Sequence, residues 1–135
     1  MTGSADEHFM HRALDLAKRG QGLASPNPLV GAVLVRDGQI IGEGFHRYAD
    51  RKHAETCALE QAGAAARGSV LFVTLEPCSH QGRTPPCTGQ LIEAGVSRVI
   101  AAMRDPNPLV AGSGFRVLHD AGLNVETGLC ESEAL

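Results

Sequence analysis

The chain has 135 residues, which favours one domain over residues 1–135 and is long enough to bury a substantial core. Its hydrophobic share of 43%, mean hydropathy of -0.06 and lack of a long apolar run exclude a membrane protein, and no apolar signal core indicates export, so we expect a cytoplasmic location. A net charge of -3 without a basic stripe argues against nucleic-acid binding.

A first amphipathic helix and a hairpin are expected in the amino-terminal third. Ser4 and Glu7 have capping-box spacing, and apolar residues then recur at helical spacing until Gly20. Two apolar, β-rich runs follow on either side of Asp37-Gly38, a strong hairpin signal, and they cover residues 29–36 and 39–46. Glycines within these strands indicate bulges or close approach by a ligand or another backbone; they are Gly31, Gly42 and Gly44.

Helices and strands then alternate to the end of the chain. Helices are expected from the neighbourhood of His53 to that of Gly68, and over residues 87–94 and 114–121. Short apolar strands are expected over residues 70–75, 97–103 and 123–127. This order predicts an α/β fold: a mixed, mostly parallel five-stranded sheet, opened by the antiparallel hairpin, with helices on both faces.

The side chains suited to difficult chemistry lie between His53 and Cys87. One imidazole and two thiolates, from His53, Cys78 and Cys87, give zinc three ligands and leave a fourth position open, as a catalytic zinc requires. Glu55 is then available to move protons. It can converge with His53 only from the first turn of a helix, because positions i and i+2 otherwise diverge. Pro77 places Cys78 just beyond a strand's carboxyl end, where open α/β sheets bind ligands.

Simpler interpretations compete with this site. Four cysteines could form two disulfides, but in a chain without a secretion signal metal binding is favoured. A structural zinc site could use His80 as a fourth ligand, although such a site would not need Glu55. Cys57 lies four residues after His53, a spacing that suits paired metal ligands, yet it would leave Glu55 without a role, so we expect Cys57 to pack.

His53-x-Glu55 followed by Pro77-Cys78 and Cys87 resembles the cytidine/deoxycytidylate deaminase superfamily. The spacing of the two cysteines is longer than the common C-x-x-C form, and the whole segment over residues 75–87 is similar to the pyrimidine deaminases of bacterial riboflavin biosynthesis. The resemblance implies a three-layer α/β/α fold, one zinc ion per chain, and Glu55 as the catalytic acid and base. It covers almost the whole chain, including the segments over residues 26–33 and 104–112.

The same resemblance implies the substrate and its contacts. The reaction would be hydrolytic deamination of 2,5-diamino-6-ribosylamino-4(3H)-pyrimidinone 5′-phosphate to 5-amino-6-(5-phosphoribosylamino)uracil and ammonia. Matching residues of the family contact the pyrimidine or the ribose phosphate, and here they are Asn27, His46, Arg83, Thr84, Asp105 and Asn107. His80 is either a direct contact or a neighbour of the ligands.

Three expectations concern what surrounds this domain. In most bacterial relatives a nicotinamide-dependent reductase domain follows, and this chain stops where it would begin, so the chain is an excised domain or a stand-alone deaminase and should bind no nicotinamide cofactor. Relatives assemble into homo-oligomers, so a dimer or tetramer is expected, with no nucleic-acid or membrane partner.

Two alternative functions stay open: a zinc deaminase of another nucleobase, nucleoside or tRNA adenosine, and a non-catalytic zinc-stabilised module.

Overall fold

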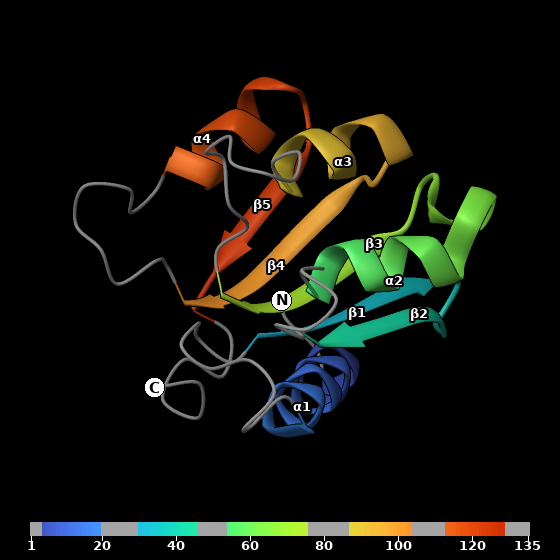
Figure 1. The fold of residues 1–135 in the computed structure, drawn as a ribbon. Helices are drawn as coiled ribbons and strands as arrows, with labels where there is room; N and C mark the ends of the chain where they lie inside the picture. The colour runs from blue at the N-terminus through green and yellow to red at the C-terminus, as the bar shows by residue number, and fades with distance from the viewer. Residues whose placement is uncertain (1–3, 20–29, 46–53, 76–86, 104–112, 129–135) are drawn as a thin grey trace.

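The computed structural model of the chain describes residues 4–19, 30–45, 54–75, 87–103 and 113–128, and these form three layers (Figure 1). The helices are α1 (Ser4–Arg19), α2 (Ala54–Ala62), α3 (Cys87–Ala94) and α4 (Ser113–Asp120), with a short 3-10 helix, η1 (Gly63–Ala66). The strands are β1 (Gly31–Arg36), β2 (Gln39–Phe45), β3 (Val70–Leu75), β4 (Arg98–Met103) and β5 (Asn124–Thr127). The predicted order of elements is confirmed.

The five strands form one mixed sheet in the order β2-β1-β3-β4-β5. Strand β1 is antiparallel to both of its neighbours, whereas β3, β4 and β5 are mutually parallel. Only β1 therefore runs against the other strands of this sheet. The mixed sheet opened by a hairpin, and the three-layer α/β/α class, are confirmed.

The hairpin between β1 and β2 has the turn that its sequence predicts. Asp37 and Gly38 have φ values of 53° and 76°, so both central residues of the two-residue loop are left-handed. This conformation matches the twist of the flanking strands, and aspartate and glycine tolerate it. The pairing register shifts between Leu34 and Val35, which marks a β-bulge.

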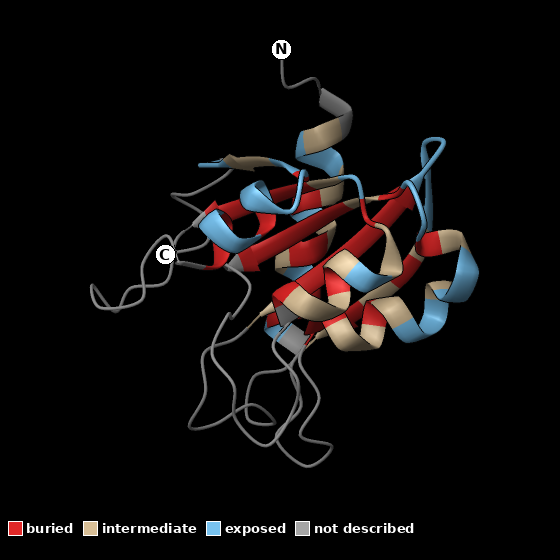
Figure 2. Cartoon of the chain, turned by 90° about the horizontal axis from the view of Figure 1, so that it is seen from above, coloured by how far each residue is buried: buried red, intermediate tan, exposed pale blue. Residues whose placement is uncertain are grey.

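The sheet separates two apolar clusters, and its three central strands, β1, β3 and β4, are largely buried between the helical layers (Figure 2). On one face, Val33 and Val35 of β1 join residues of α1. On the other, Ala32 and Leu34 join residues of α2, α3 and α4. Because both faces of β1 are covered, this strand is apolar at successive positions. Fully burying a large apolar side chain stabilises the fold by about 1.5–3 kcal/mol.

Helix α2 ends earlier than the alanine pattern predicts. The α-helical part stops at Ala62, and the chain continues as η1 instead of an α-helix to the neighbourhood of Gly68. Gly63 has a φ of 56°, a left-handed conformation that ends a regular helix. Ala66 of η1 is still buried in the core, so the apolar stripe is used although the helix type changes.

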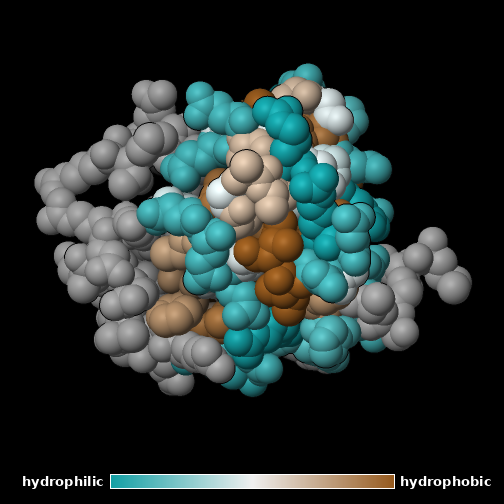
Figure 3. Space-filling model, turned by 90° about the vertical axis from the view of Figure 1, so that its right-hand side faces the viewer, coloured by the Kyte–Doolittle hydropathy of each residue, from teal (hydrophilic) through white to brown (hydrophobic). Residues whose placement is uncertain are grey.

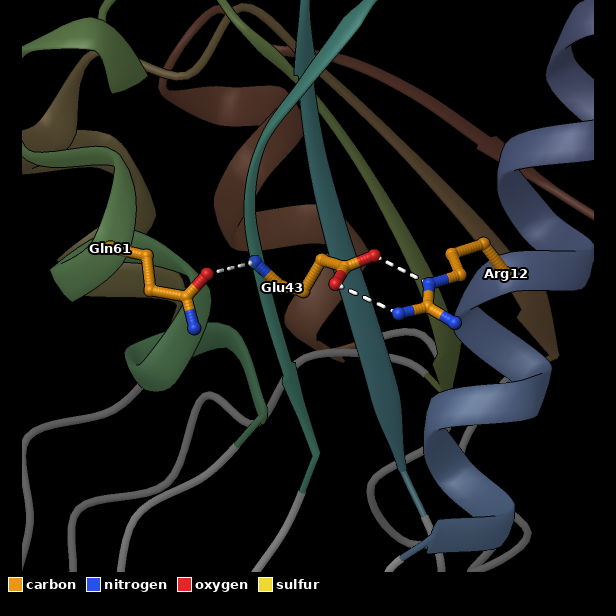
Figure 4. A network of polar contacts seen from close by, with 3 residues as sticks. All are labelled: Arg12, Glu43 and Gln61. Atoms are coloured by element: carbon orange, nitrogen blue, oxygen red, sulfur yellow. Dashed lines mark hydrogen bonds and ion pairs between the residues drawn. The ribbon is translucent and has the colours of Figure 1, made fainter.

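Strand β2 lies at one edge of the sheet and is tied to a helix on each side (Figure 4). Arg12 of α1 donates to the Glu43 carboxylate through Nε at 2.5 Å and Nη2 at 3.0 Å. The Glu43 backbone N–H donates to Gln61 Oε1 of α2 at 3.0 Å. The hydrogen bond to the Glu43 carboxylate raises the pKa of Arg12 above its ordinary value. Ion pairs with this exposure contribute about 0–1 kcal/mol to the free energy of unfolding. The main effect of this ion pair is therefore to fix the position of α1 relative to β2.

Little large apolar surface is exposed in the part of the chain that the structure describes. Ile40 of β2 and Val117 of α4 are the exposed large hydrophobic residues there, at 39% and 40% of their surface. The face drawn in Figure 3 is largely hydrophilic, with a narrow apolar strip. None of the described helices has the length and apolar character that crossing a membrane requires.

Candidate active site

The four strands that run in one direction end at the edge of the sheet where β1 begins. Phe45, the last residue of β2, pairs with Gly31, the first of β1. Leu75, which ends β3, pairs with Met103, which ends β4. The antiparallel register of β1 with β3 brings these two groups together. Because open α/β sheets bind ligands outside the carboxyl ends of their strands, this edge is the candidate site.

A buried hydrogen bond fastens the start of β1 to the end of β3 at this edge. The Gly31 N–H donates to Thr74 Oγ1 at 3.1 Å, and Thr74 is 4% exposed. A threonine hydroxyl in the core is costly unless it is hydrogen-bonded, and here it satisfies a backbone donor at the beginning of a strand. The bond therefore holds two of the strand ends of the candidate site in register.

Glu55 lies in the first turn of α2, as the sequence predicts, and its residue surface is only 3% exposed. The helix begins at Ala54, immediately after His53. Burying a carboxylate is expensive unless it is paired, hydrogen-bonded or protonated, so proteins keep such groups mainly where they serve a purpose. A buried acid in a helix start is therefore the strongest chemical feature in the described part of the chain.

The first turn of α2 rests directly on β2 because β2 has glycine where the helix crosses it. A Cβ added to Gly44 would lie 2.3 Å from the Ala54 carbonyl oxygen. One added to Gly42 would lie 2.2 Å from the Ala58 carbonyl oxygen. The close approach predicted from these glycines is thus confirmed, and the approaching backbone is that of α2. This contact sets the height of Glu55 above the sheet.

Helix α3 begins at Cys87 and packs beside α2, so the starts of two helices contribute to the candidate site. Thr56 Oγ1 of α2 donates to Gln90 Oε1 of α3 at 2.8 Å in a partly buried hydrogen bond. Sequence reasoning did not single out either residue, because they are 34 positions apart and no local pattern links them. Thr56 directly follows Glu55, and Gln90 comes three residues after Cys87.

Most of the predicted site residues lie outside the described residues. This holds for the ligands His53 and Cys78, and the side chain of Cys87 is likewise not described, although its backbone opens α3. It also holds for His80 and for all the predicted substrate contacts, namely Asn27, His46, Arg83, Thr84, Asp105 and Asn107. Within the described ranges no group of three or more His, Cys, Asp or Glu residues could hold a metal ion. The ligand set therefore stays a prediction.

The described backbone is compatible with that zinc centre. Helix α2 begins one residue after His53, α3 begins at Cys87, and both helices contribute to the same core cluster on one face of the sheet. Helix amino termini carry a partial positive charge that favours the thiolate form of cysteine over the thiol. The thiolate is the form that binds metal. An imidazole and two thiolates are a donor set that zinc accepts.

Cys57 packs against the sheet, as expected. A Cβ added to Gly44 would lie 2.5 Å from the Cβ of Cys57, so Cys57 contacts β2, and its side chain is partly exposed. We predict that Cys57→Ala leaves bound zinc near one ion per chain, because the Cβ that contacts β2 is kept. Metal analysis of the purified variant beside the wild type checks this. Loss of zinc would add Cys57 to the ligand set.

Comparison with protein families gives a match over residues 3–103 to the cytidine and deoxycytidylate deaminase zinc-binding region. The chain belongs to this deaminase family. The match includes α1, the hairpin, Glu55 and all three predicted zinc ligands. The deaminase fold predicted from the motif is therefore confirmed.

Individual relatives narrow the position of this deaminase chain within the family. It is 57% identical over 129 residues to the riboflavin biosynthesis protein RibD of Escherichia coli, covering 96% of this chain and 35% of that protein. The Acinetobacter baumannii RibD structure is 53% identical with a TM-score of 0.94, covering 97% of this chain and 37% of that one. The Thermotoga maritima diaminohydroxyphosphoribosylaminopyrimidine deaminase/5-amino-6-(5-phosphoribosylamino)uracil reductase structure is 49% identical with a TM-score of 0.90, at 97% and 38% coverage. The chain thus spans little more than a third of these relatives.

Proposed function

We propose that the chain catalyses hydrolytic deamination of 2,5-diamino-6-ribosylamino-4(3H)-pyrimidinone 5′-phosphate, a step of riboflavin biosynthesis. The observation that carries the proposal is the buried Glu55 carboxylate at the start of α2, beside the carboxyl ends of the strands. The similarity of the chain to RibD, over 96% of the chain's length, supports the choice of substrate, because RibD is named for riboflavin biosynthesis. The reaction consumes water and releases ammonia and 5-amino-6-(5-phosphoribosylamino)uracil.

We assign zinc binding to His53, Cys78 and Cys87. The zinc ion, once bound, supplies a hydroxide nucleophile near neutral pH by lowering the pKa of water. The two cysteines contribute thiolates, and the helix start at Cys87 favours that ionised form. The imidazole and the two thiolates make three protein ligands, one fewer than in a closed structural site, so the fourth coordination position is open for chemistry.

Glu55 moves the protons of the reaction in this proposal. It accepts a proton from the attacking water and passes it to a ring nitrogen as the amino-bearing carbon is attacked. Glu55 then takes the second proton of that water from the hydroxyl group now on the carbon and gives it to the departing amine, which leaves as ammonia as the carbonyl forms. The contact between α2 and β2 holds the first turn of the helix, and hence this carboxylate, at a fixed height over the sheet edge. Exclusion of water around Glu55 strengthens its electrostatic interactions.

The remaining predicted residues would bind the substrate. His46 directly follows the end of β2, and Asp105 comes two residues after the end of β4, so both are next to strand ends of the candidate edge in the sequence. Arg83 and Thr84 offer hydrogen-bond donors for the phosphate, and Asn27 and Asn107 offer amides for the pyrimidine or ribose. His80 is assigned to the neighbourhood of the ligands. A cytoplasmic, homo-oligomeric enzyme without nicotinamide binding stays our prediction.

Ammonia release tests the substrate. We expect the purified, zinc-loaded chain to release ammonia from the diaminopyrimidinone ribosyl phosphate and not from cytidine or guanine, because the proposed phosphate contacts serve only the phosphorylated substrate. A coupled ammonia assay with all three compounds measures this. Turnover of cytidine or guanine instead would assign the chain to another base, and turnover of none by a zinc-loaded chain would contradict the proposal.

A further inference from the structure

The hydrogen bond between Thr56 and Gln90 stands out because it joins the two helices that carry the proposed chemistry. Thr56 directly follows Glu55 in the first turn of α2. Gln90 lies one helical turn after Cys87, the residue that opens α3. The two bridging residues thus stand three positions after His53 and three positions after Cys87, which are two of the proposed zinc ligands.

Other described contacts hold α2 elsewhere. The glycines of β2 fix its height above the sheet, and Gln61 in its last turn accepts the Glu43 N–H at the far end of the helix. Neither contact sets the distance from the start of α2 to the start of α3. The hydrogen bond from Thr56 Oγ1 to Gln90 Oε1, at 2.8 Å, does span this gap.

We infer that Thr56 and Gln90 are positioning residues that fix the spacing between Glu55 and the zinc ligand Cys87. This inference rests on the proposed function. The bond is partly buried, so solvent competes with it less than at the surface. Neither side chain needs to touch the substrate. Their effect passes through the first turns of the two helices, which must keep a proton-transfer group and a metal ligand in one geometry during turnover.

The expected effect is moderate and specific to the chemical step. Thr56→Val keeps the shape of the side chain but removes the donor, and we expect kcat to fall by about 3- to 10-fold with KM changed less than about twofold, the size of one lost neutral hydrogen bond. Release of zinc to a chelator should accelerate by a similar factor. Thr56→Ser retains the hydroxyl and should restore both values.

Two further variants separate positioning from general loosening of the fold. Gln90→Met removes the same bond from α3, and the double variant with Thr56→Val should lose no more than Gln90→Met alone, because that variant already lacks the bond. Gln61→Met removes a side-chain hydrogen bond from the remote end of α2 and should leave kcat and zinc release unchanged. Equal losses in Gln61→Met, additive losses in the double variant, or wild-type values in Thr56→Val would each overturn the inference.

The two readouts keep this test apart from that of the substrate. If the wild-type chain releases ammonia but Thr56→Val matches it in kcat and zinc release, the positioning role is wrong and the proposed function stands. If no compound is turned over, zinc release decides alone. Faster release in Thr56→Val and Gln90→Met, but not in Gln61→Met, would support the positioning role, and unchanged release would contradict it.

Discussion

Glu55→Gln should lower kcat by about 100- to 10,000-fold, the range typical of a general acid/base, while zinc stays bound. Glutamine has nearly the shape of glutamate, so the first turn of α2 and its contact with β2 should be preserved. It cannot accept the proton of the attacking water or return one to the leaving amine. Steady-state ammonia release, metal analysis and a thermal melt of the same preparation measure the three quantities.

Glu60→Gln provides the matched control for this variant. Glu60 lies on the same helix but is exposed, so the same chemical change there should leave kcat within about twofold, as for most surface substitutions. A Glu55→Gln enzyme that retained wild-type activity would remove Glu55 from the mechanism. Loss of zinc from it would instead show that Glu55 supports the metal rather than proton transfer.

Gly44→Ala should reduce both stability and activity. The added Cβ would lie 2.3 Å from the Ala54 carbonyl oxygen and 2.5 Å from Cys57 Cβ, and backbone atoms cannot move aside by changing rotamer. Such overpacking typically costs about 1–3 kcal/mol of unfolding free energy. The helix start must shift to relieve it, and misplacing Glu55 by about 1 Å could lower kcat by about 100-fold. Urea unfolding and ammonia release measure the two effects.

Gly42→Ala separates loss of stability from loss of positioning. The added Cβ would lie 2.2 Å from the Ala58 carbonyl oxygen, so the clash is of similar severity but falls one turn further along α2. We expect comparable destabilisation and a smaller fall in kcat, since the first turn is displaced less. Equal falls in kcat would show that the position of the first turn is not what Gly44 protects. A Gly44→Ala chain as stable as the wild type would contradict the packing argument.

The fold was predictable because its signals are local. Asp37-Gly38 indicates a two-residue hairpin by its backbone preferences alone, and the apolar run over residues 70–75 is short, continuous and bounded, as in a strand covered on both faces. The end of α2 was not predictable in this way. Alanine continues past Ala62, and only the left-handed conformation of Gly63, which glycine permits without requiring, changes the helix type.

In the candidate site the place of Glu55 was predictable, whereas the contacts that support it were not. The first-turn position of Glu55 follows from its spacing to His53, because side chains two residues apart converge only at the start of a helix. Gly44 could equally have indicated a ligand or a second backbone, and packing against α2 decides between them. The hydrogen bond from Thr56 to Gln90 depends on how α2 and α3 pack side by side. The two residues are 34 positions apart, so no local sequence pattern indicates this packing.

The hydrogen bond from the Glu43 backbone to Gln61 has a consequence for self-association. An outer strand with open N–H and C=O groups is a template for pairing with another chain, and proteins commonly obstruct such strands. Strand β2 occupies that position, and the Gln61 side chain already takes up the N–H of Glu43. A second copy could not pair there without displacing an existing partner. A homo-oligomer of this chain should therefore not form by extending the sheet across β2.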